Sequence, residues 1–278
     1  MPAGNRRPSK ALRIRNPVAA HGLAVGAFLV SLGLVLGSSC AFAIEDRADV
    51  DPNDRLDPGE VVSWKATVSN YRDSVRGQAY DLNLRGNTAD FAFWLGEYRG
   101  AGGFDQTRVG TEYGHRLLMG RLVGSLQAAT GGFLGWSLTW DGKQEDRPGF
   151  APLIGFGRTN NKPYYNLNFD PNDSILAGGT FSSPAVGVLM LYQIRDDRLH
   201  TGQRVNHLVW RKSLGEDRRI TLDAFSRRGA EAPGKPVYCG LGATLTLDLG
   251  DTFLRLGYDP KANYTNANIA RIAAGIRF

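Results

Sequence analysis

The feature that most constrains this chain is a two-residue repeat of apolar and small or polar side chains. In residues 239–249 the apolar face carries Cys239, Leu241, Ala243, Leu245, Leu247 and Leu249. In residues 269–278 that face ends at Phe278, and the opposite face carries Arg271 and Arg277. Side chains of a β-strand alternate with this period, whereas those of a helix repeat every 3.6 residues. Because no convincing helical period follows Val61, the sequence predicts an all-β fold.

Clusters of Gly, Asn, Asp and Pro divide the alternating part of the chain into strand-length segments. We predict fourteen strands, at 61–70, 78–85, 90–98, 107–116, 121–129, 133–141, 150–159, 173–181, 185–195, 203–213, 218–227, 238–249, 252–258 and 268–278. Twelve strands remain open if two weaker segments merge. An even number is required of a bacterial barrel whose two termini lie on one side.

The connections between these segments fall into two length classes. Short ones are expected at 117–120, 182–184, 214–217 and 250–251. Long ones are expected at 100–106, 160–172, 196–202, 229–237 and 259–267. Such alternation is typical of a membrane barrel with periplasmic turns and extracellular loops. Two connections depart from it, because 130–132 is short for an outer loop and 142–149 is long for an inner turn.

The first 43 residues have the layout of a secretory signal peptide. A cationic stretch precedes the apolar run 23–36, and Ala41-Phe42-Ala43 is a small-x-small cleavage pattern. The run of 14 apolar residues is short of the roughly 20 that span a bilayer, which disfavours a membrane anchor. A lipoprotein signal ending at Cys40 lacks the large aliphatic residue expected upstream. Residues 44–60 then form an acidic, Pro-containing periplasmic extension, and 61–278 form the barrel.

Alternating strands suit either a soluble sandwich or an outer-membrane barrel. In the sandwich the apolar faces form the core, and in the barrel they meet lipid. The export signal favours the barrel, as do aromatic residues near segment ends. The sandwich remains the alternative fold.

The chain ends in Ala-Ala-Gly-Ile-Arg-Phe, with Phe278 as the final residue after an alternating strand. This ending resembles the C-terminal strand of Gram-negative outer-membrane β-barrels of porin-like type. The resemblance covers the signal segment, the alternating architecture and the last ten residues, and it identifies no particular family. It implies a closed antiparallel up-and-down barrel in the cell outer membrane, in contact with lipid and lipopolysaccharide. It also implies that the barrel assembly machinery reads the strand ending at Phe278.

The charge of the chain excludes one class of partner. The 278 residues carry 33 Lys and Arg against 27 Asp and Glu, a net charge of +6. Five of the cations and none of the acids lie in residues 1–43, so the chain after Ala43 is almost neutral. A nucleic-acid-binding domain needs clustered positive charge, and we therefore expect no nucleic-acid partner.

Arginine side chains are the main candidates for solute-binding residues. If the Leu and Ile faces meet lipid, the opposite faces place Lys65, Arg85, Arg108, Glu112, Arg116, Asp223, Arg255 and Arg271 in the lumen. Guanidinium groups match carboxylate and phosphate geometry, so this lining predicts passage or binding of small hydrophilic solutes, anionic ones included. The alternative is a structural network in which arginines and acids neutralise one another.

Two other functions remain as alternatives to the channel. A lipid-modifying hydrolase or acyltransferase needs a nucleophile beside a histidine, and His207 is the best base, with Ser226 or Ser213 as partners. A non-conducting structural or surface-interaction barrel would act through the Tyr- and Asn-rich loop 160–172. The recurring Asp-Pro-Asn pattern, at 51–53 and 170–172, fits turn chemistry better than calcium binding. We expect no metal and no cofactor.

Overall fold

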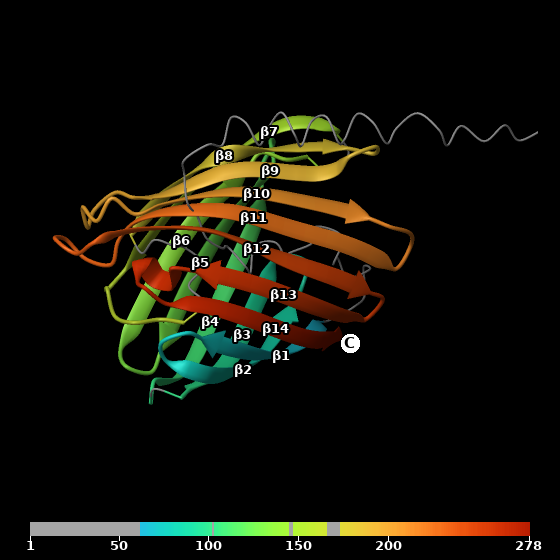
Figure 1. Cartoon of the computed structure of the whole chain (residues 1–278). Coiled ribbons are helices and arrows are strands. Elements are labelled where there is room, and N and C mark those ends of the chain that lie inside the picture. Colours follow the sequence, from blue (N-terminus) through green and yellow to red (C-terminus); the bar gives the residue numbers. More distant parts are fainter. Residues whose placement is uncertain (1–61, 102, 145–146, 166–172) are drawn as a thin grey trace, which may run out of the picture. The chain divides into compact units, whose positions relative to one another are not determined.

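The computed structural model describes residues 62–101, 103–144, 147–165 and 173–278. They form a closed barrel of fourteen antiparallel strands in chain order (Figure 1). The strands are β1 (Ser63–Asp73), β2 (Gly77–Asn87), β3 (Phe91–Gly100), β4 (Asp105–Arg116), β5 (Arg121–Ala129), β6 (Phe133–Asp141), β7 (Gly149–Thr159), β8 (Ser174–Ser183), β9 (Gly187–Asp196), β10 (Arg204–Ser213), β11 (Arg218–Ala230), β12 (Val237–Leu249), β13 (Thr252–Pro260) and β14 (Asn268–Arg277). A short 3₁₀ turn, η1 (Ala262–Tyr264), precedes β14.

The barrel confirms the predicted fold class and strand number. Each strand pairs with its neighbour in sequence, and β14 pairs with β1, so the ladder has no open edge. The twelve-stranded and sandwich alternatives are wrong. The predicted signal peptide 1–43 and extension 44–60 lie outside the described residues. No helix among the described residues is long and apolar enough to cross a membrane.

Most strand limits agree with the sequence pattern to within three residues, and those of β5 and β6 agree fully. The strands run longer where their ends are polar. Thus β1 extends to Asp73, whose carboxylate accepts hydrogen bonds from the backbone N–H groups of Val75 and Arg76 in the next turn. At the seam, Phe278 and Trp64 exchange two backbone hydrogen bonds of 2.7 and 2.9 Å.

The two ends of the barrel differ in their connections. We call the end that holds the start of β1 and the end of β14 the terminal end, and the opposite one the loop end. Strands β7, β9, β11 and β13 end at the loop end, and the connections that start there are 160–173, 197–203, 231–236 and 261–267. The expected long connection 100–106 is shorter, at 101–104, because β3 and β4 extend into it. The short 130–132 and the long 142–148 persist as exceptions.

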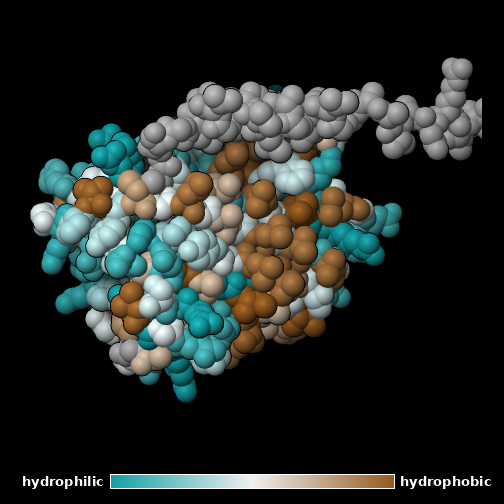
Figure 2. Space-filling view, in the orientation of Figure 1, coloured by the Kyte–Doolittle hydropathy of each residue, from teal (hydrophilic) through white to brown (hydrophobic). Residues whose placement is uncertain are grey.

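The outer wall of the barrel is apolar. Exposed large hydrophobic side chains lie on most strands, for example Val68, Leu82, Leu95, Leu126, Ile154, Leu191, Leu241, Leu256 and Ile272. Figure 2 shows apolar side chains gathered toward the end where the C-terminus lies, with hydrophilic ones over the opposite end. The lone thiol of the described chain, Cys239, is also exposed on this wall.

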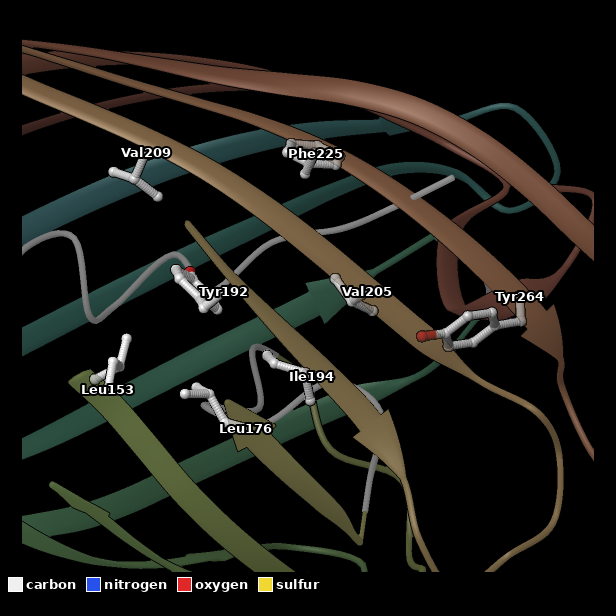
Figure 3. Close-up of a cluster of buried hydrophobic side chains, with 8 residues drawn as sticks. All are labelled: Leu153, Leu176, Tyr192, Ile194, Val205, Val209, Phe225 and Tyr264. Carbon is white, nitrogen blue, oxygen red and sulfur yellow. The ribbon is translucent and has the colours of Figure 1, made fainter. Parts of the chain in front are cut away.

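The inner wall is divided between polar and apolar side chains, which corrects the expectation of a polar lumen throughout. On β7–β11 the inward side chains form a buried hydrophobic cluster with Tyr264 of η1 (Figure 3). Its other members are Leu153, Leu176, Tyr192, Ile194, Val205, Val209 and Phe225. The rule that leucine and isoleucine faces meet lipid fails here, because these strands carry apolar residues on both faces.

Candidate solute-binding wall inside the barrel

The predicted lumen residues lie on inward positions of their strands, but they do not all meet. Five of them line one cavity and are called here the cationic wall: Lys65, Arg85, Arg108, Arg255 and Arg271. The cavity is completed by Thr67, Asp81, Asn83, Trp94 and Tyr164. Strands β1, β2, β4, β13 and β14 therefore supply five cations, and the same lining contains one carboxylate.

The other three predicted residues lie elsewhere. Glu112 is not part of the cavity lining but contacts it through Arg85. Its carboxylate accepts a 2.5 Å hydrogen bond from Arg85 Nη2. Arg116 is exposed at the terminal end of β4. Asp223 is buried on β11, where it contacts His207 instead of the cationic wall.

One ion pair of the wall is deeply buried. Arg108 on β4 reaches across β3 and forms an ion pair with Asp81 on β2, and both side chains are 3% exposed. The path crosses Gly96, where an added Cβ would lie 2.6 Å from Arg108 Nη2. The absence of a side chain at Gly96 thus leaves room for the guanidinium against the strand.

Other cations of the wall contact neutral groups. Arg255 Nε donates to Thr246 Oγ1 at 3.1 Å, and Arg271 Nη2 donates to Ser69 Oγ at 3.1 Å. Lys65 Nζ lies 4.7 Å from the centre of the Phe253 ring. Such contacts hold the cations in position while adding no negative charge.

Tyr164 and Tyr165, which follow β7, lie in the interior beside this wall. Arg108 Nη1 donates to the carbonyl oxygen of Tyr165 at 2.9 Å, and the Tyr165 N–H donates to Gln106 Oε1 at 2.9 Å. The Tyr165 ring stacks on Tyr98 with 3.8 Å between ring centres. Burial raises the pKa of the Tyr165 hydroxyl well above its usual value, so this phenol stays uncharged.

His207 belongs to a separate cluster in the apolar half. Its Nδ1 lies 3.0 and 3.1 Å from the two Asp223 carboxylate oxygens, and its ring stacks on Tyr192 at 4.7 Å. Its Nε2 is buried, with no hydrogen-bond partner in the described part of the chain.

Neither serine suggested as a nucleophile lies close enough to His207 for its hydroxyl to be activated. The strand register sets His207 opposite Phe225, so Ser226 points to the outer wall, where its Oγ accepts a 3.1 Å hydrogen bond from Asn206 Nδ2. Ser213 lies six positions along β10, at its exposed end. The suggested partnership of His207 with either serine is therefore wrong, because Ser226 faces the opposite side of the sheet and Ser213 lies six residues, about 20 Å, along the strand.

The sequence analysis did not identify the hydroxyl groups of Ser69 and Thr246 or the contacts of Tyr165 as parts of the site. Ser69 and Thr246 occupy inward positions of strands that were predicted, so the alternation itself places them in the lumen. Gln106 was missed because the predicted strand began one residue later. Nothing in the local sequence around Tyr165 shows that it folds onto Arg108, 57 residues away.

Comparison with known proteins gives similarity of structure only. No protein-family model and no curated sequence matches the chain. The translocator domain of the autotransporter NalP from Neisseria meningitidis is 12% identical, with 94% of this chain and 100% of that chain covered and a TM-score of 0.40. The NanC porin is 10% identical, with coverages of 76% and 98% and a TM-score of 0.40. A Rhodopseudomonas blastica porin is 9% identical, with coverages of 78% and 100% and a TM-score of 0.42. These scores define no family relationship.

Proposed function

We propose that this protein is a porin-like barrel of the outer membrane that binds or passes small anionic, hydrophilic solutes through its interior. The observation that carries the proposal is the cationic wall, where five cations and one carboxylate line one cavity. The lining holds more cations than carboxylates, and this charge balance favours a negatively charged solute in the cavity.

The outer wall supports the membrane location. Soluble proteins rarely expose apolar patches larger than a few hundred Å², whereas here apolar side chains cover many neighbouring strands. A closed barrel satisfies its backbone hydrogen bonds internally, which is the condition for crossing a bilayer with strands. Trp140 and Trp210 lie near the terminal end of their strands and donate their indole N–H groups to carbonyl oxygens in adjacent connections, at 2.8 and 2.9 Å. Amphipathic rings of this kind suit a membrane interface.

The chemistry of the wall supports the class of solute. Planar guanidinium groups bind carboxylates and phosphates through paired N–H donors. Arg255 and Arg271 stand on neighbouring strands, and their hydroxyl partners Thr246 and Ser69 fix part of each side chain. Both guanidinium groups line the same cavity, so an anionic group bound there would lie in the positive potential of both.

Planar-bilayer recording of the refolded protein tests the proposal. We expect conductance with a preference for chloride over potassium in a salt gradient. The double variant Arg255→Ser/Arg271→Ser should lower that preference by severalfold, because it removes two of the five cations. Arg72→Ser is the matched control, since Arg72 is exposed on the outer wall of β1 and should leave the selectivity unchanged.

Two results would contradict the proposal. Absence of conductance, together with absence of binding of small carboxylates or phosphates in solution, would exclude both the channel and the binding barrel. Unchanged ion selectivity in the double variant would exclude the cationic wall as the source of selectivity.

A further inference from the structure

Three arginines stand side by side on the outer wall at the loop end. Arg204 on β10 lies directly opposite Arg195 on β9 and directly opposite Arg228 on β11. We call these three residues the arginine row. Their chain neighbours Ile194, Val205 and Arg227 are buried at 0–1% exposure, whereas Arg195 and Arg228 are exposed and Arg204 is half-buried. The row therefore points away from the interior.

The row has no counter-charge within the described part of the chain. None of its three guanidinium groups forms an ion pair or a side-chain hydrogen bond there. Two acids of the neighbouring connections are bound elsewhere, because Asp197 pairs with Arg158 at 2.7 Å and Asp173 with Arg198 at 2.8 Å. Asp196 accepts hydrogen bonds from Thr201.

Like charges directly opposite on adjacent strands repel, because their Cβ atoms are only about 5 Å apart. We therefore expect three arginines in one row where a bound anion lies between them and offsets their mutual repulsion. Long arginine side chains at this spacing can converge on one tetrahedral anion through paired N–H donors.

The rows that follow toward the terminal end change in a definite order. The next row holds Gln193, Asn206 and Ser226, where Gln193 Nε2 donates to Asn206 Oδ1 at 2.6 Å and Asn206 Nδ2 donates to Ser226 Oγ at 3.1 Å. The row after it holds Leu191, Leu208 and Ala224. The outer wall of β9–β11 thus passes from cations through neutral polar groups to apolar side chains.

We propose that this strip binds an anionic lipid, with its phosphate on the arginine row and its acyl chain along Leu191 and Leu208. The order of the three rows matches the order of phosphate, polar linkage and hydrocarbon in such a lipid. A free inorganic anion would contact the first row alone, whereas an anionic lipid would contact all three. The inference rests on the proposed membrane location, but it does not depend on what passes through the interior.

The test measures retention of a short-chain phosphatidic acid by the refolded full chain in zwitterionic detergent, using native mass spectrometry. We expect the double variant Arg195→Gln/Arg204→Gln to bind at least tenfold more weakly than the wild type. Arg72→Gln should change binding less than twofold, because Arg72 is exposed on the outer wall of β1 at the same end but has no arginine opposite it. Heat-modifiable gel migration checks that each variant is folded.

Equal retention by the wild type and the double variant would overturn the proposal. Displacement of phosphatidic acid by equimolar inorganic phosphate would also overturn it, because the site would then select a soluble anion. A second variant, Arg204→Lys, keeps the charge but loses the paired donors, and we expect an intermediate affinity. Planar-bilayer conductance is measured on the same preparations, so a failed channel with intact lipid retention, or the reverse, separates this proposal from the proposed function.

Discussion

Replacing Asp81 by asparagine tests whether the buried ion pair of the cationic wall stabilises the barrel. Asp81 and Arg108 have side chains that are 3% exposed, so the substitution leaves a buried guanidinium without its carboxylate. Breaking such a pair typically costs about 3–5 kcal/mol. Asparagine retains one acceptor oxygen, and Arg108 keeps its hydrogen bond to the Tyr165 carbonyl oxygen. We therefore expect a loss near the lower limit, about 3 kcal/mol.

Guanidinium-chloride unfolding in detergent micelles, followed by tryptophan fluorescence, measures this loss. Asp90→Asn makes the same chemical change at an exposed acid whose carboxylate lies 3.9 Å from Arg121, and it should cost less than about 1 kcal/mol. The double variant Asp81→Asn/Arg108→Gln should recover part of the stability, because the two sites are coupled. Equal stability of Asp81→Asn and Asp90→Asn would refute the reasoning.

Three further predictions concern other parts of the interior. Gly110→Ala should destabilise the barrel by about 1–3 kcal/mol in the same unfolding assay, because the new Cβ would lie 2.1 Å from the Trp94 ring; Gly124→Ala, with its nearest neighbour at 3.9 Å, is the control. Tyr165→Ala should increase single-channel conductance, and an unchanged value would show that this ring does not narrow the passage. We expect no lipid hydrolysis by the wild type or by His207→Ala, and hydrolysis that disappears in the variant would revive the hydrolase hypothesis.

The strands were predictable because the two walls of the barrel differ in composition at most positions. On β12 the outward Leu241, Leu245 and Leu249 alternate with inward glycine, threonine and aspartate, so the period and the orientation can both be read locally. The same pattern places Lys65, Arg85, Arg108, Arg255 and Arg271 on one side of the sheet. These five line one cavity because closure of the barrel pairs β14 with β1 and places β13 on the far side of β14.

The apolar half of the interior was not predictable in this way. On β9, Leu189 and Leu191 face outward while Met190, Tyr192 and Ile194 face inward, so hydrophobicity no longer distinguishes the walls. The contacts of Tyr165 with Arg108 and Gln106 depend on the path of the chain just after β7, which no local period encodes. The arginine row was equally hidden, because Arg195, Arg204 and Arg228 become neighbours only through the register of three strands.

The most direct test of the central claim is a crystal structure of the protein grown with bromide, whose anomalous scattering marks anion positions. We predict bromide in the interior, in contact with at least two of Lys65, Arg255 and Arg271. An interior without bromide, in a crystal whose outer wall binds it, would contradict the assignment of the cationic wall as an anion site.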